Sequence, residues 1–197
     1  MTGPYHDFLL LPEGAEGERI YRDFWEADPE VDPRPNYRAF RLRNHGIRVP
    51  SDLICYIRDT LDWVPSEHPF PESGGWAEPW CGHGLDDWGH TVISQRGAPV
   101  FRRVCQAWAN LFALAPRTFR LRGLWVIDAD EVPRVVGQKQ SPYEPRLAPD
   151  TAMPRFTKGD YERLEFHRRE VVPLLHKLTA HAEKAATGEF FILHVGM

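Results

Sequence analysis

The sequence is short of the residues and runs that mark several common classes of protein. Its 197 residues include only three cysteines, Cys55, Cys81 and Cys105, with no paired spacing. An odd number without a framework predicts reduced thiols and no disulfide. No apolar run approaches the roughly 20 residues that cross a bilayer, and the start lacks the basic flank of a signal peptide. We therefore expect a cytoplasmic protein with no membrane as partner.

Basic residues are not in excess either. Lys and Arg total 24 against 28 Asp and Glu, which gives a formal net charge of −4. Nucleic-acid-binding proteins usually present a basic face, so we expect no nucleic acid as partner. Acidic residues gather between Glu13 and Asp32, and a basic run from Arg34 to Arg48 follows directly. Two interpretations stay open: the two stretches attract each other on a solvated surface, or the acidic segment faces a basic partner.

Catalytic and cofactor-binding motifs are missing from the sequence. It contains no GxGxxG or P-loop spacing, no GxSxG, no HExxH and no CxxC pair. Cys105 lies in an apolar helical stripe and His194 in an apolar strand, so both are expected to be buried core residues. We therefore predict no catalytic residue, no bound metal and no cofactor, and a protein that is not an enzyme.

The sequence is rich in apolar residues with helical periodicity. It is 42% hydrophobic and 12% aromatic, which suffices for a core without a metal or disulfide at this length. Apolar spacing predicts helices from about Ser51 to Val64, from Pro99 to Ala115 and from about Arg168 to Thr187. Trp108 lies in the middle of the second apolar stripe, and Gly188 supplies a stop for the third helix.

Apolar runs predict four strands, at residues 91–94, 118–127, 161–166 and 190–195. These strands flank the second and third helices and give two strand–helix–strand units. We predict an α+β fold in which residues 1–197 form a single domain, a mixed β-sheet with helices packed on it. Residues 1–87 make an N-terminal half with the acidic segment and a loop rich in Trp, Gly and Pro, and residues 88–197 hold the paired units.

Two proline-rich segments, 65–89 and 128–159, exceed ordinary loop lengths. The first contains three tryptophans, which are too many for a disordered linker, so we predict that it is ordered. Aromatic anchors beside charged groups are typical of protein–protein interfaces. The candidate partner-binding residues are the aromatic and acidic side chains of this loop: Trp76, Glu78, Trp80, Asp86, Asp87 and Trp88.

The same loop, WCGHGLDDWGH at residues 80–90, allows a different interpretation. Cys81, His83 and His90 are residue types that ligate metals or form a Cys–His nucleophile pair. Their spacing matches no established zinc pattern, and glycine-rich turns also collect His and Asp for backbone reasons alone. We therefore keep a metal or hydrolase site as an alternative.

Two segments of the C-terminal half, WGHTVISQRGAPVFRRVCQAWANLFALAP and EFFILHVGM, carry a family resemblance. From Trp88 onward the chain resembles bacterial immunity-type proteins found beside polymorphic toxin genes. The matching segments form core, so no functional residue carries over from them. The resemblance implies a cytoplasmic protein that neutralises a cognate toxin by binding it, without catalysis.

The leading hypothesis is therefore a non-enzymatic protein-binding protein, an immunity-type inhibitor whose partner is a toxin protein. One alternative is a small hydrolase or metal-dependent enzyme centred on the Cys81/His83/His90 loop. Another is a structural component of a larger assembly. Nothing in the sequence sets the oligomeric state.

Overall fold

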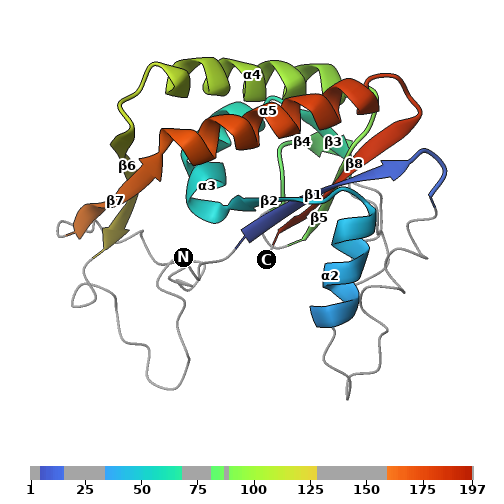
Figure 1. Ribbon diagram of the computed structural model, residues 1–197, viewed down its shortest axis with the longest axis horizontal. Helices are drawn as coiled ribbons and strands as arrows, with labels where there is room; N and C mark the ends of the chain where they lie inside the picture. Colours follow the sequence, from blue (N-terminus) through green and yellow to red (C-terminus); the bar gives the residue numbers. More distant parts are fainter. Residues whose placement is uncertain (1–4, 16–33, 68–80, 87–88, 128–158, 197) are drawn as a thin grey trace, which may run out of the picture. The chain divides into compact units, whose positions relative to one another are not determined.

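The computed structural model describes residues 5–15, 34–67, 81–86, 89–127 and 159–196. Four helices and eight strands lie in these residues (Figure 1). Their order along the chain is β1 (Tyr5–Pro12), α2 (Arg34–Arg43), β2 (Ile47–Pro50), α3 (Ser51–Leu61), β3 (Pro65–Glu67), β4 (Cys81–His83), β5 (His90–Ile93), α4 (Ala98–Ala113), β6 (Thr118–Ile127), β7 (Gly159–His167), α5 (Arg168–Ala185) and β8 (Phe190–Gly196). The predicted α+β class is confirmed.

The three predicted helices are α3, α4 and α5. Each carries an apolar stripe at helical spacing, and α3 buries Leu53, Ile54, Ile57 and Leu61 along it. In α4 a proline occupies the first turn, where its missing N–H costs nothing. The chain leaves α5 through Gly188, whose φ of +82° favours glycine.

Six strands form one sheet in the order β2-β1-β8-β5-β3-β4. All five pairings in this sheet are antiparallel. β1 and β8 are central and pair over seven positions, from His6↔Gly196 to Pro12↔Phe190. Both are buried along nearly their whole length, as expected for strands covered on two faces.

The sheet differs from the predicted arrangement in two respects. A mixed sheet was predicted, whereas every pairing among its six strands is antiparallel. β6 and β7 pair only with each other, in a separate two-stranded sheet. The units β5–α4–β6 and β7–α5–β8 therefore do not contribute equivalent strands to one sheet. Instead β5, which precedes α4, pairs with β8 in the six-stranded sheet. β7, which precedes α5, pairs with β6 in the two-stranded sheet. The similarity between the two units is one of element order only.

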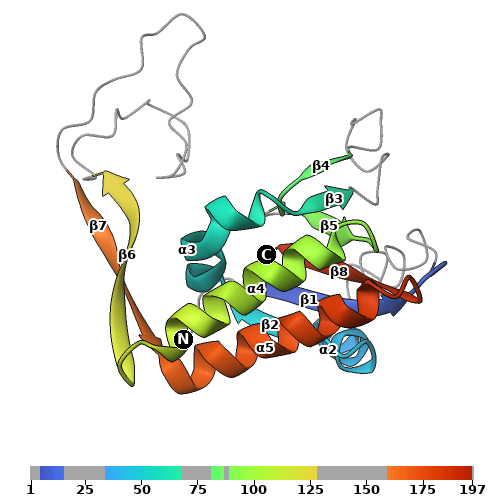
Figure 2. The same cartoon turned by 90° about the horizontal axis from the view of Figure 1, so that it is seen from above.

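Helices α3, α4 and α5 cover one face of the large sheet, and α2 lies on the opposite face (Figures 1 and 2). On the first face, Phe8 of β1 stacks on Phe101 of α4 with ring centroids 5.6 Å apart. On the second face, Phe40 of α2 packs against a cluster of alternate β1 and β8 residues: Leu9, Leu11, Phe191, Leu193 and Val195. The alternation follows from the two-residue period of a strand.

The chain divides into two compact units, Met1–Phe119 with His167–Met197, and Arg120–Phe166. Within the second unit, Arg120 of β6 pairs with Glu165 of β7 at 2.9 Å. Gly123 lies so close to Glu162 and Leu164 that an added Cβ would come within 3.0 Å of each. The prediction of a single domain stays a prediction. Among the described residues, no helix is both long and apolar enough to cross a bilayer.

Candidate interaction surface

The structure places one of the six predicted partner-binding residues. Trp76, Glu78, Trp80, Asp87 and Trp88 lie outside the described residues. Asp86 is described and half-buried between β4 and β5, where its backbone N–H donates to Thr91 Oγ1 at 2.9 Å. This hydrogen bond joins the residue that follows β4 closely in the sequence to β5.

Strand register separates two residues of the alternative metal or hydrolase site. Glu67 of β3 is level with both Cys81 and Val92, and β4 and β5 run in the same direction on either side of β3. His83 follows Cys81 by two residues, whereas His90 precedes Val92 by two. With strands about 4.8 Å apart and residues about 3.3 Å apart, the two histidine Cα atoms are roughly 16 Å apart. One metal ion cannot take both side chains, so the three-residue site is wrong as a joint ligand set.

The C-terminal end of α3 lies against the β3–β4 hairpin. The backbone N–H of Gly84 donates to the carbonyl oxygen of Val64 at 2.9 Å. Gly84 has a φ of +93°, and an added Cβ would come within 2.8 Å of Asp62 Oδ1. Both the backbone conformation and the close approach of Asp62 therefore require glycine. The contact brings the end of the helix and the hairpin edge onto one surface.

An exposed tryptophan lies on this surface. Trp63 follows α3 directly and is 64% exposed. Asp59 and Asp62 precede it on one face of the helix end, and among the described residues neither forms an ion pair. We define the Trp63 surface by these residues and their hairpin neighbours: Asp59, Asp62, Trp63, His83 and Asp86. An exposed aromatic side chain that follows the exposed acidic residues Asp59 and Asp62 suits a basic protein surface.

The structure also contains a buried charged cluster that the sequence analysis missed. Asp7 of β1 is fully buried. Arg48 of β2 donates to both of its oxygens, from Nε at 3.0 Å and from Nη2 at 2.8 Å. Tyr37 of α2 also donates to Asp7, and Arg41 Nη1 lies 3.5 Å from its Oδ1. These groups fix α2 and β2 to the centre of the sheet.

The Asp7 cluster suits a structural role better than a catalytic one. Burial, and then the charge of Asp7, raise the pKa of Tyr37, so its hydroxyl stays protonated. The hydrogen bond from Arg48 to Asp7 raises the pKa of Arg48. The Asp7 carboxylate is enclosed by its donors and has no access for a substrate. A lone acidic residue within the apolar run DFLLLP was the signal for this cluster.

A pair of buried histidines lies on the other face of β1 and β8. His6 Nδ1 and His194 Nε2 are 2.8 Å apart, and the two rings stack. Burial is the largest cause that lowers the pKa of His6 to about 4, and burial also lowers the pKa of His194. Both rings are therefore neutral near pH 7. The prediction of a hydrogen-bonded core histidine at position 194 is confirmed.

The hydrogen bonds of the two rings assign the tautomer of each histidine. His194 Nδ1 is buried without a hydrogen-bond partner. An unpaired acceptor costs less than an unpaired N–H, so we assign the proton of His194 to Nε2, which donates to His6 Nδ1. Both rings are almost completely buried, so neither presents a basic nitrogen to solvent.

The remaining described thiols and acids form no site. Cys105 is fully buried, and burial raises the pKa of its thiol, so it stays protonated and unreactive. Cys55 is half-buried, and among the described residues neither Cys55 nor Cys105 forms a disulfide. Within the described part of the chain, no three His, Cys, Asp or Glu side chains gather where a metal ion could be held.

Comparison of the chain with protein-family models, with curated proteins and with solved structures found no match.

Proposed function

We propose that this chain is a non-enzymatic protein-binding protein, an immunity-type inhibitor that acts in the bacterial cytoplasm and neutralises a cognate toxin by direct binding. The observation that carries the proposal is the Trp63 surface. There a 64% exposed tryptophan directly follows the end of α3, where Asp59 and Asp62 are exposed as well. Such an arrangement combines a large apolar anchor with charges that select a basic partner.

Two further observations support a binding role. Asp7, His6 and His194 are all buried within the fold, where none of them is open to a substrate. The chain has a net charge of −4, which favours association with a basic protein. Trp76, Trp80 and Trp88 lie outside the described residues and remain predicted anchors.

The test uses the toxin domain encoded beside the gene, purified together with this chain. We expect Trp63→Ala to weaken the complex by about 2 kcal/mol or more, the usual hot-spot scale, because the indole fills a pocket on the partner. The melting temperature of the free chain should stay within about 2 °C, since the removed side chain is largely exposed. Leu114→Ala, which truncates another exposed apolar residue, is the matched control and should leave affinity unchanged.

A charge-reversal pair tests the electrostatic part of the proposal. Asp59→Lys with Asp62→Lys should slow association, and the loss should shrink as salt screens the charges. Glu189→Lys, an exposed reversal outside the Trp63 surface, should have little effect. A neighbouring toxin that neither binds the chain nor loses activity in its presence would refute the inhibitor. Wild-type affinity of Trp63→Ala for the toxin would show that the Trp63 surface is not the binding site.

A further inference from the structure

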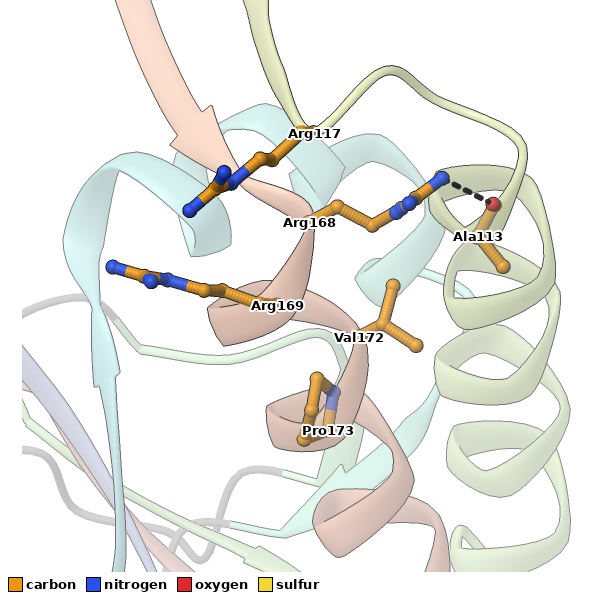
Figure 3. A pocket seen from close by; sticks show the side chains of 6 residues that line it. All are labelled: Ala113, Arg117, Arg168, Arg169, Val172 and Pro173. Atoms are coloured by element: carbon orange, nitrogen blue, oxygen red, sulfur yellow. Dashed lines mark hydrogen bonds between the residues drawn. The ribbon is translucent and has the colours of Figure 1, made fainter.

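An open pocket of about 460 Å³ lies where α4 ends and α5 begins (Figure 3). It shares no residue with the Trp63 surface. Three arginines and three apolar residues line it: Ala113, Arg117, Arg168, Arg169, Val172 and Pro173. No acidic residue is part of the lining. The lining residues therefore have a formal charge of +3, although the whole chain has a net charge of −4.

The backbone around the pocket is held in place by Arg168. Its Nη1 donates to the carbonyl oxygen of Ala115 at 2.9 Å and lies 3.5 Å from that of Ala113. Its backbone N–H donates to the carbonyl oxygen of Arg117 at 3.0 Å. Arg168 thus satisfies carbonyls at the C-terminal end of α4 and ties that end to the start of α5.

The other two arginines extend to the same side of the junction (Figure 3). Arg169 has a weak ion pair with the adjacent Glu170, with 3.6 Å between Nε and Oε1, and its side chain is 67% exposed. Among the described residues, Arg117 has no ion pair. Guanidinium groups that line one pocket repel each other, and an anion that accepts hydrogen bonds from both relieves this repulsion.

The pocket offers apolar contact as well as positive charge. Val172 and Pro173, from the first turns of α5, and Ala113 of α4 form this part of the lining. A ligand that combines an anionic head with an apolar body matches both features. Arginine is suited to phosphate because its planar group donates two parallel hydrogen bonds to two oxygens, and a phosphate monoester has enough oxygens to serve two arginines.

We propose that this pocket binds a phosphate monoester of a small organic molecule. The phosphate lies between Arg117 and Arg169, and the organic group lies against Ala113, Val172 and Pro173. The positive end of the 18-residue helix α5 adds to the field of the two arginines. The proposal is independent of the inhibitor function, because it uses other residues and another class of ligand.

Isothermal titration of the full chain with phenyl phosphate, at constant ionic strength, tests the proposal. We expect saturable binding with one ligand per chain. Arg117→Gln and Arg169→Gln should each weaken binding by about tenfold, a loss of one charge-assisted contact. Lys177→Gln removes an exposed charge from α5 outside the pocket and should change affinity by less than about twofold. Inorganic phosphate and benzoate should both bind more weakly, since each lacks one of the two features.

Three outcomes would overturn the proposal. A titration without saturable binding of phenyl phosphate would show that the pocket is not a binding site for this class of ligand. Equal loss of affinity in Arg117→Gln and Lys177→Gln would show that phenyl phosphate responds to the overall charge of the chain and not to this pocket. Equal affinity for phenyl phosphate, inorganic phosphate and benzoate would show that neither the apolar lining nor the dianion is recognised. Melting temperatures of the variants, measured without ligand, separate a lost contact from a lost fold.

Discussion

Trp108 of α4 joins two helices through packing and one hydrogen bond. Its Nε1 donates to Thr60 Oγ1 of α3 at 2.9 Å. Its ring meets Tyr56 edge to face at 5.6 Å and lies 5.3 Å from Phe112. The side chain is half-buried, so it is anchored to the core without being enclosed by it.

These contacts predict the effect of truncation. Trp108→Ala should lower the free energy of unfolding by about 3 kcal/mol, because the ring contacts and the hydrogen bond are both lost. Trp108→Phe should lower it by about 1 kcal/mol, since only the hydrogen bond and part of the area disappear. Urea unfolding measures both. Leu114→Ala, at an 84% exposed position, is the control and should lie within about 0.5 kcal/mol of wild type.

A result for Trp108→Ala that matched the control would mean that α3 and α4 are not joined through this ring. The predicted apolar stripe of α4 needs one correction. Leu111 belongs to the same apolar pattern in the sequence, yet it is 54% exposed, because α3 covers the Trp108 side of α4 and leaves Leu111 outside.

At the scale of an element, the end of α5 depends on one backbone conformation. Gly188 has a φ of +82°, and an added Cβ would approach the Gln95 side chain to 3.1 Å. Gln95 Nε2 in turn donates to the carbonyl oxygen of Ala186 at 3.3 Å, which satisfies a group at the helix end. The turn therefore links α5 to the loop before α4.

Gly188→Ala should destabilise the protein by about 1 kcal/mol, through strain at positive φ and crowding of Gln95. Gly14→Ala is the matched comparison, since Gly14 has a φ of +78° but no atom within 4 Å of the added Cβ. It should cost less, because only backbone strain remains. Thermal unfolding of both variants decides the matter. A larger loss in Gly14→Ala would contradict the contribution of Gln95.

At the scale of the whole molecule, stability should fall as the pH falls below about 6.5. His6 titrates at about 4 in the folded protein and near 6.5 when unfolded, and burial lowers the pKa of His194 and of His181 in the same direction. Between pH 6.5 and about 4 the unfolded chain binds more protons than the folded protein, so acid favours unfolding. For His6 alone the difference in pKa, from 6.5 to about 4, corresponds to roughly 3 kcal/mol.

The measurement is the free energy of unfolding from pH 7.5 down to about 4.5, for wild type and His6→Gln. We expect a shallower decline in His6→Gln, because the variant has no imidazole to protonate at this position. The exposed His176→Gln is the control and should follow the wild-type curve. Parallel curves for wild type and His6→Gln would show that the buried pair does not set the acid sensitivity.

The sequence alone determined the elements whose signal is local. α3, α4 and α5 were predicted because apolar spacing at a 3.6-residue period depends only on neighbours in the chain. β5, β6, β7 and β8 were predicted from apolar runs, and the stop of α5 from Gly188, which are also local features of the chain. These elements suffice for the α+β class, since each needs another layer against which to bury its apolar side.

Only the tertiary structure decided the elements that depend on distant partners. β1 is central because β8 pairs with it, and its His6 finds its hydrogen-bond partner 188 positions later. α2 lacks a strong apolar stripe, and it is held by Tyr37 and Arg41 on the buried Asp7. The sequence contains these residues but not their pairing, because charge and hydrogen-bond partners are fixed by the fold.

The candidate site divides in the same way. Asp86 was predicted from the composition of its loop, whereas Trp63 follows an apolar helical stripe and nothing local shows that its ring is exposed. The separation of His83 from His90 came from strand register, and the gathering of Arg117 with Arg169 came from the packing of α4 on α5. Residue types are a property of the chain, but distances between them are set when the elements pack.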